Sequence, residues 1–275
     1  MREDVSRRRL LGGGAMTAAM ALSGCVATGQ RDVQETEAET FEVDDLESVT
    51  VGARNGQLTV RAEERETVEV RQTTKAASEG DAENVWLEST RTGDRLDLTV
   101  EREDTPVLIR FGPDPRMDLE VTVPEDLAID RVGVRNGVLD VTGVTGSLTT
   151  EARNGLLEVR DVDGDLTATA RNGVVDVDGV EGSLTAQTRN GPVDVTGVDG
   201  DVEVETRNGE VSLEVPSSLD ATVGVSTRNG EISVDGIDDL ESTSGDSSFH
   251  GTAGDGTHRI DLETRNGAVT VRGLE

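Results

Sequence analysis

Eight arginines of this 275-residue chain begin the same tripeptide, Arg-Asn-Gly, at spacings that would align their guanidinium groups. The tripeptides begin at Arg54, Arg135, Arg153, Arg171, Arg189, Arg207, Arg228 and Arg265, and each step from 135 to 207 is 18 residues. A guanidinium fork binds carboxylate and sulfate well, so such a row could grip an anionic glycan or the acidic groups of a partner protein. The alternative, which we favour on the sequence, is that each arginine pairs with a nearby acid such as Asp140, Glu158 or Asp176.

Other groups that could bind a metal or catalyse a reaction are sparse. His250 and His258 lie in a segment rich in Ser, Gly and Asp, with only carboxylates as possible co-ligands, so we expect surface histidines. Asp163-Gly164-Asp165 and Asp199-Gly200-Asp201 could hold calcium at a turn. Sister corners carry serine instead, which favours ordinary Asp-Gly turn chemistry. We therefore expect no metal, no cofactor and no catalytic residue.

The N-terminal residues have the pattern of an export signal. Arginines at positions 7 to 9 precede a run of Gly, Ala, Met and Leu that is too short to span a bilayer. The paired arginines resemble a twin-arginine signal, which exports folded proteins. Leu22-Ser23-Gly24-Cys25 resembles a lipoprotein lipobox, in which the cysteine becomes the mature N-terminus and carries lipid.

The chain has no other cysteine than Cys25, which excludes a disulfide framework and a cysteine metal cluster. We predict that residues 1–24 are the signal peptide and that residues 25–40 are a flexible tether. Lipid on Cys25 would hold the protein on the outer face of the cytoplasmic membrane, its one expected membrane contact.

The composition is strongly acidic, with a formal net charge of −30. Lys75 is the single lysine, and this combination resembles the proteins of extreme halophiles, so the sequence resembles a haloarchaeal lipoprotein. Nucleic acid is an improbable partner for such a surface. Aromatic residues make up 1% of the chain, so any core must consist of Val, Leu, Ile and Ala.

The 18-residue period indicates a stacked repeat. Each repeat contains two runs of alternating apolar residues, typical of strands with one buried face, and two glycine corners. We predict an all-β fold, a parallel β-solenoid of 18-residue, two-strand coils, in which the recurrent asparagines form a ladder. The asparagines of this repeat motif are Asn55, Asn136, Asn154, Asn172, Asn190, Asn208, Asn229 and Asn266. The alternative is an antiparallel meander of Asn-Gly hairpins.

The two parts of the solenoid are expected to differ in regularity. Residues 41–130 still alternate, but irregularly, and are predicted to cap the stack, whereas residues 131–275 hold the regular repeats. Residues 241–258 are predicted to be a loop excursion that explains a 37-residue step between two motifs. The segments 123–127 and 215–219 share the pattern Val-Pro-x-x-Leu and look like one variant coil used twice.

The strand, Asn-Gly, apolar-x-apolar and Gly-x-x-Gly pattern, with the preceding Val-Pro-x-x-Leu, resembles the DUF4097 family of proposed adhesins over roughly residues 46–275. The resemblance implies no catalytic residues. We therefore expect a lipid-anchored cell-surface protein that binds an envelope protein or glycan, or that serves as a structural spacer. The alternative is a carbohydrate-active enzyme on a β-helix scaffold, which the short loops and scarce aromatics disfavour.

Overall fold

The computed structural model describes residues 21–22, 33–103 and 113–274. The predicted lipid-attachment residue, Cys25, lies outside them, as does most of the predicted signal peptide. The described chain is almost entirely β, and its one helix, α1 (Glu79–Ala82), is a single turn. Within these residues no helix has the length and apolar character needed to cross a membrane.

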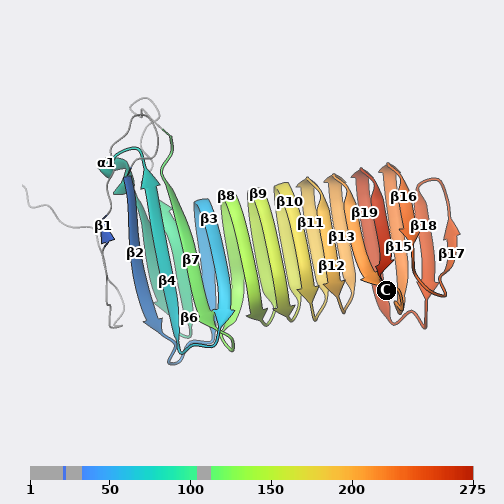
Figure 1. Cartoon of the computed structure of the whole chain (residues 1–275), viewed down its shortest axis with the longest axis horizontal. Coiled ribbons are helices and arrows are strands. Elements are labelled where there is room, and N and C mark those ends of the chain that lie inside the picture. Colours follow the sequence, from blue (N-terminus) through green and yellow to red (C-terminus); the bar gives the residue numbers. More distant parts are fainter. Residues whose placement is uncertain (1–20, 23–32, 104–112, 275) are drawn as a thin grey trace, which may run out of the picture.

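The strands form one row along the long axis of the molecule (Figure 1). The N-terminal strands are β1 (Ala21–Leu22), β2 (Val33–Glu42), β3 (Ser48–Glu63), β4 (Thr67–Ala76), β5 (Val85–Thr92), β6 (Arg95–Arg102) and β7 (Arg116–Pro124). The central strands are β8 (Ala128–Thr145), β9 (Leu148–Asp163), β10 (Leu166–Val180), β11 (Leu184–Asn190) and β12 (Val193–Val198). The C-terminal strands are β13 (Val202–Asn208), β14 (Val211–Pro216), β15 (Ala221–Asn229), β16 (Ile232–Asp235), β17 (Glu241–Ser244), β18 (Ser248–Ala253), β19 (His258–Asn266) and β20 (Val269–Leu274).

The central coils pair in parallel with a constant shift of one repeat. Leu166 of β10 lies opposite Leu184 of β11, and Val175 lies opposite Val193 of β12. The predicted parallel solenoid is therefore confirmed, and the antiparallel meander of hairpins is wrong for the Asn-Gly repeats. Each coil contributes one strand before its Asn-Gly corner, on what we call the first face, and one strand after it, on the second face.

The core between the two faces is built from stacked aliphatic side chains. Alternate residues of each strand point inward, so equivalent positions such as Leu148, Leu166 and Leu184 lie one above another and are almost fully buried. Leu157, Val175 and Val193 form the facing column. Many thin layers of similar volume thus replace the aromatic core that the composition lacks.

The Asn-Gly corners join successive coils through side chains as well as backbone. The ladder begins at Asn55, and each later asparagine donates from Nδ2 to Oδ1 of the one before it at 2.6–2.8 Å, in the stack order 55, 136, 154, 172, 190, 208, 266 and 229. The following glycines stack so closely that a Cβ on Gly155 would lie 1.7 Å from the carbonyl oxygen of Gly137. Gly155 also has φ +135°, which glycine alone adopts readily. The corner therefore accepts no other residue type without a shift of the backbone.

The stack order departs from the sequence order near the C-terminus. Strand β19 lies between β13 and β15, and β20 lies between β14 and β16. The last coil of the sequence is thus inserted before the coil that precedes it in the chain, and Figure 1 shows β19 between β13 and β15. The chain skips one coil position after β14, where Leu219 donates its amide N–H to the oxygen of Pro216 at 3.1 Å.

The same device occurs at the N-terminal end. Strand β3 pairs with β6 and β7 on one side and with β8 on the other, so the step from β7 to β8 also skips one coil. Here Leu127 donates to the oxygen of Pro124 at 3.2 Å. The two Val-Pro-x-x-Leu segments are therefore the two corners at which the chain spans two coil positions instead of one.

Antiparallel strands finish both ends of the stack. At the N-terminal end β2 pairs with β4, β4 with β7, and β5 with β6. Because β2 begins at Val33, the prediction of a flexible tether is wrong for residues 33–40. At the other end β18 pairs antiparallel with β15 and β17. The predicted loop at 241–258 is therefore largely a capping hairpin, which covers an edge that would otherwise be open to pairing.

Asp118 of β7 fastens the N-terminal cap to the first Asn-Gly coil. Its Oδ1 accepts the amide N–H of Gln57 at 2.9 Å, and its Oδ2 lies 2.8 Å from Nζ of Lys75. Burial would raise the pKa of Asp118, but these two hydrogen bonds and the nearby charge of Arg116 hold the pKa below its usual value. The carboxylate is thus charged and bonded where the ladder ends.

Candidate binding surface: the arginine column

The ladder positions the motif arginines. In each regular coil the residue before the arginine points into the core, as Ala152 and Ala170 do, and the asparagine after it is held in the ladder. The arginine between them must therefore point outward from the first face. Arg54 is half-buried, whereas the other seven are exposed, and we call these seven the arginine column: Arg135, Arg153, Arg171, Arg189, Arg207, Arg265 and Arg228, in stack order.

The guanidinium groups of the arginine column form no ion pair and no hydrogen bond within the described part of the chain. Arg54, by contrast, lies 2.9 Å from Glu101. The remaining arginines of the described ranges all have partners: Arg91 donates to a backbone oxygen, and the others form ion pairs with carboxylates. The column is thus the one set of described arginines whose guanidinium groups are available to a ligand.

The predicted neutralisation of the column by neighbouring acids is wrong. Asp140 and Glu158 point outward from the second face, beyond the Asn-Gly corner, where they pair with arginines outside the motif. Asp140 lies 3.8 Å from Arg160 and 3.9 Å from Arg61, and Arg160 also bonds to Glu158. The corner separates the arginine column from these acids. The two groups are close in the sequence, but the fold places them on different faces.

The second face is acidic where the first is basic. Asp140, Glu158, Asp176 and Asp194 occupy equivalent positions on successive coils. Burial is the largest cause of the raised pKa of Asp194, and repulsion from Asp176 and Glu210 raises this pKa further. Like charges therefore accumulate along this column, and the two faces of the central coils carry opposite charge.

A groove of about 540 Å³ crosses the first face of the central coils. Arg135, Arg153, Arg171 and Arg189 line it, with the short residues Gly133 and Thr169 between them. Glu151, the one carboxylate among its described lining residues, is paired with Arg131 at 3.5 Å. The groove therefore combines four unpaired arginines with an acid whose charge is already balanced.

The same motif has different neighbours in the C-terminal coils. Two residues before the arginine, where the central coils have Gly133, Glu151, Thr169 and Gln187, the next two coils of the stack have Glu205 and Glu263. Two residues further back they have Glu203 and Asp261. Arg207 and Arg265 are thus surrounded by carboxylates although they are not paired with them.

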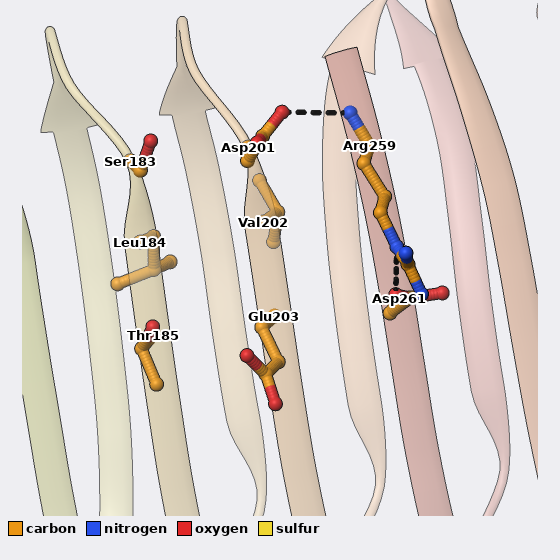
Figure 2. Close-up of a pocket in the computed structure, with 8 residues that line it drawn as sticks. All are labelled: Ser183, Leu184, Thr185, Asp201, Val202, Glu203, Arg259 and Asp261. Carbon is orange, nitrogen blue, oxygen red and sulfur yellow. Dashed lines mark hydrogen bonds and ion pairs between the residues drawn. The ribbon is translucent and has the colours of Figure 1, made fainter.

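A second, smaller hollow of about 380 Å³ lies where the inserted strand β19 meets β13 (Figure 2). Asp201 accepts the amide N–H of Arg259 at 2.8 Å, and the Arg259 side chain turns to Asp261. His258 lies beside them, 3.9 Å from Asp201. These contacts fasten the inserted coil to its neighbour, so the hollow is explained by the architecture.

The remaining sequence candidates lie apart from the groove. His250 is exposed on β18 and His258 is half-exposed at the start of β19. Among the described residues no group of His, Cys, Asp and Glu has the geometry of a metal site. Asp165 accepts the amide N–H of Ser183 on the next coil at 2.9 Å, as Asp201 does that of Arg259. These two aspartates of the possible calcium corners thus bond to backbone of the neighbouring coil.

Sequence reasoning found the arginine row but not its division into two parts. The signal was present two residues before each arginine, because side chains at that spacing share a strand face. Those residues are neutral or balanced in the central coils and acidic in β13 and β19.

Crystal structures of three bacterial proteins align with most of this chain. A proposed cell adhesion protein from Clostridium sporogenes is 13% identical with a TM-score of 0.36, and the alignment covers 88% of this chain and 100% of that one. A proposed adhesin from Bacteroides fragilis is 12% identical with a TM-score of 0.37, covering 87% and 97%. A proposed adhesin from Parabacteroides merdae is 13% identical with a TM-score of 0.32, covering 87% and 96%.

A comparison with curated proteins gives no match. The family comparison matches the C-terminal part of the solenoid, from β10 to β20. Residues 165–272 of this chain match the family model described as Toastrack DUF4097.

Proposed function

We propose that the protein is a lipid-anchored cell-surface protein of adhesin type, which attaches to an anionic component of the envelope through the arginine column. The observation that carries this proposal is the set of seven exposed motif arginines that form no ion pair with any described residue, in a chain whose formal net charge is −30. Leaving like charges unpaired in a line is unfavourable unless salt or a ligand screens them. A surface that binds anions would retain them.

Two further features support this proposal. The family that residues 165–272 match is the one that the motif pattern resembles, and that resemblance implies an adhesin. The N-terminal pattern, ending at Cys25, resembles that of an exported lipoprotein. The acidic composition suits molar salt, which screens charges that lie far apart. Hydrogen-bonded pairs between a guanidinium group and an anion are less sensitive to this screening, so the column could still bind a ligand there.

A structural spacer is the second candidate function, and the continuous asparagine ladder favours it. The asparagine ladder and the stacked glycines that follow the asparagines join every Asn-Gly coil to the next, and we expect this to make the solenoid stiff. The two roles are compatible, since a spacer can present a binding face away from the membrane. A glycan-cleaving enzyme finds less support, because the one carboxylate of the groove, Glu151, is paired with Arg131.

Envelope binding is tested by sedimentation. Fragments of the envelope, stripped of the native protein, are incubated with the whole chain and pelleted. The variant Arg153→Gln/Arg171→Gln/Arg189→Gln is compared with the matched variant Arg207→Gln/Arg228→Gln/Arg265→Gln, which removes the same charge from the same motif. We expect the first variant to remain in the supernatant and the second to pellet like the parent. Equal pelleting of all three proteins would show that the column is not the attachment surface.

Anchoring is tested separately at Cys25. Replacing the sulfur nucleophile by Cys25→Ser removes the site of lipid attachment and should release the protein from membranes into the medium. The readout is the membrane-bound fraction together with the mass of the N-terminal peptide, which gains lipid in the parent alone. A Cys25→Ser protein that stays on the membrane would contradict lipid anchoring.

A further inference from the structure

The seven arginines of the column are equivalent in the ladder but not in their surroundings. At the central coils the outward positions two and four residues before Arg135, Arg153, Arg171 and Arg189 carry one acid, Glu151, and one further arginine, Arg131, and these two form an ion pair. Four positive charges therefore remain there without compensation.

The coils of β13 and β19 have the opposite balance on the same face. Four carboxylates, Glu203, Glu205, Asp261 and Glu263, occupy the corresponding outward positions. Asp261 is paired with Arg259, which leaves three acids beside Arg207 and Arg265. Glu210 also follows the corner at the place where the central coils have Val138, Leu156, Val174 and Pro192. In β15 the positions before Arg228 hold Gly224 and Ser226, which lie beside Asp261 and Glu263 of β19. The uncompensated positive charge is thus concentrated in the stretch from β8 to β11.

The spacing of the four central arginines is set by the fold. Their coils are hydrogen-bonded neighbours in parallel register, so successive motif positions are about 4.8 Å apart and the four span about 14 Å along the axis. The groove that they line also includes the small residues Gly133 and Thr169. A small anion would meet one or two guanidinium groups, whereas a chain laid along the groove would meet all four.

We propose that this groove binds a linear anionic polysaccharide, bearing carboxylate or sulfate groups, whose chain runs along the solenoid axis from β8 to β11. This inference rests on the proposed function and names the ligand class of the same surface. Each anionic group is held by an arginine fork. Once the first group is bound, the next is presented at high local concentration, so affinity grows with the number of arginines engaged.

A polysaccharide fits this surface better than nucleic acid does. A single glycan strand is narrow enough to meet the first face alone, whereas a duplex would bring further phosphates against the acidic body. Single-stranded nucleic acid is held largely by stacking on aromatic side chains, and none of the described residues that line the groove is aromatic.

The test measures binding of alginate, which carries carboxylates, and dextran sulfate to the immobilised whole chain in 1 M KCl. Each polymer is used as a disaccharide and as a chain of about 20 sugars, and an oligonucleotide of equal charge is a third probe. We expect at least one long polymer to bind about tenfold or more tightly per anionic group than its disaccharide. The better of the two identifies the anionic group.

The two triple variants separate the central arginines from the others. Arg153→Gln/Arg171→Gln/Arg189→Gln should weaken binding of the long polymer about 100-fold, and Arg207→Gln/Arg228→Gln/Arg265→Gln less than about twofold. Arg171→Lys, which keeps the charge but loses the fork, should fall between the parent and the central triple variant. This single substitution also serves if a triple variant fails to fold, which its melting curve shows.

Several results would overturn the inference: no binding of either polysaccharide, equal affinity for disaccharide and polymer, equal losses in the two triple variants, or tighter binding of the oligonucleotide. Its failure is distinguishable from failure of the proposed function. If the central triple variant loses envelope binding while the parent binds neither polysaccharide, the ligand class is wrong and attachment through the column stands. If both triple variants still pellet with envelopes like the parent, the proposed function itself fails.

Discussion

One motif repeats in two regions of the molecule that differ in surface charge and in stack order. These are the central coils, β8 to β12, and the C-terminal coils, β13 to β16 with β19 and β20. Inside the stack they are alike, because the same asparagine, glycine and aliphatic columns run through both. Outside they differ in charge, and along the chain they differ in order. The interior of a solenoid thus follows the repeat, while its surface and its topology follow the residues that break the repeat.

Shortening the skipping corner should have the largest effect on this comparison. Deleting residues 217–219 restores an 18-residue step between Arg207 and Arg228, which leaves the corner too short to span two coil positions. We expect β15 and β16 to occupy the position of β19 and β20, and the C-terminal coil to be displaced. Limited proteolysis should then cleave within 258–274, which the parent protects. An unchanged cleavage pattern would show that the three extra residues do not determine the stack order.

Substitution of the stacked glycines that follow the ladder asparagines should have the next largest effect. A Cβ on Gly173 would lie 1.7 Å from the oxygen of Gly155, with coils packed on both sides, so Gly173→Ala should cost more than about 3 kcal/mol of unfolding free energy. A Cβ on Gly230 would meet Gly267 equally closely, but Gly230 is the last of these stacked glycines and can shift outward. Urea denaturation should show a clearly smaller loss for Gly230→Ala, and equal losses would contradict this reading.

The asparagine ladder should show the same contrast at lower magnitude. Asn172 both donates to Asn154 and accepts from Asn190, whereas Asn229 donates to Asn266 and ends the ladder. Asn172→Ala therefore leaves two amide groups without their partners and should cost about 2 kcal/mol. Asn229→Ala should cost about 1 kcal/mol. Thermal melts of both variants measure the two losses of stability. Equal losses, or no loss in either variant, would show that the ladder does not stabilise the fold.

The smallest expected effects are pH-dependent and opposite in sign. Asp118, with its lowered pKa, stabilises the fold at neutral pH, and this contribution is lost as the pH falls through that lowered value. Asp194, with its raised pKa, destabilises the fold at neutral pH, and the penalty disappears as the pH falls below the ordinary aspartate value. Both groups are partly solvated, so each effect should be about 1 kcal/mol or less.

Melting temperatures of two variants across pH test this difference. At pH 7 Asp118→Asn should melt below the parent and Asp194→Asn above it. On acidification the Asp194→Asn difference should vanish first, because its carboxyl takes up a proton at higher pH than that of Asp118. Shifts of the same sign in the two variants at pH 7 would contradict the assignment.

Much of the fold could be predicted because the repeat itself encodes it. Asn154, Asn172 and Asn190 recur every 18 residues, and only a parallel stack gives identical side chains a use at identical positions. The insertion of β19 could not be predicted from strand chemistry, since β13, β15 and β19 all end in Thr-Arg-Asn. The 21-residue step and the Val-Pro-x-x-Leu corner were its signals, but their meaning depends on the three-dimensional path.

The arginines of the candidate site could be predicted from the sequence, but the absence of ion pairs at their guanidinium groups, within the described residues, could not. Pairing of Arg153 with Glu158 is reasonable by sequence distance, yet the Asn-Gly corner places them on different faces. The residues that matter are those of adjacent coils, such as Arg131 for Glu151. Such neighbours become evident only when the register is known.

Protection of individual arginines in the bound state is the most direct test of the account. The whole chain, free and bound to envelope fragments, is treated with an arginine-specific dicarbonyl reagent, and modification of each motif arginine is measured by peptide mass spectrometry. Since all seven are exposed in the free protein, each should react there. We expect binding to protect Arg135, Arg153, Arg171 and Arg189 and to leave Arg207, Arg228 and Arg265 reactive. Equal protection of all seven, or of none, would contradict it.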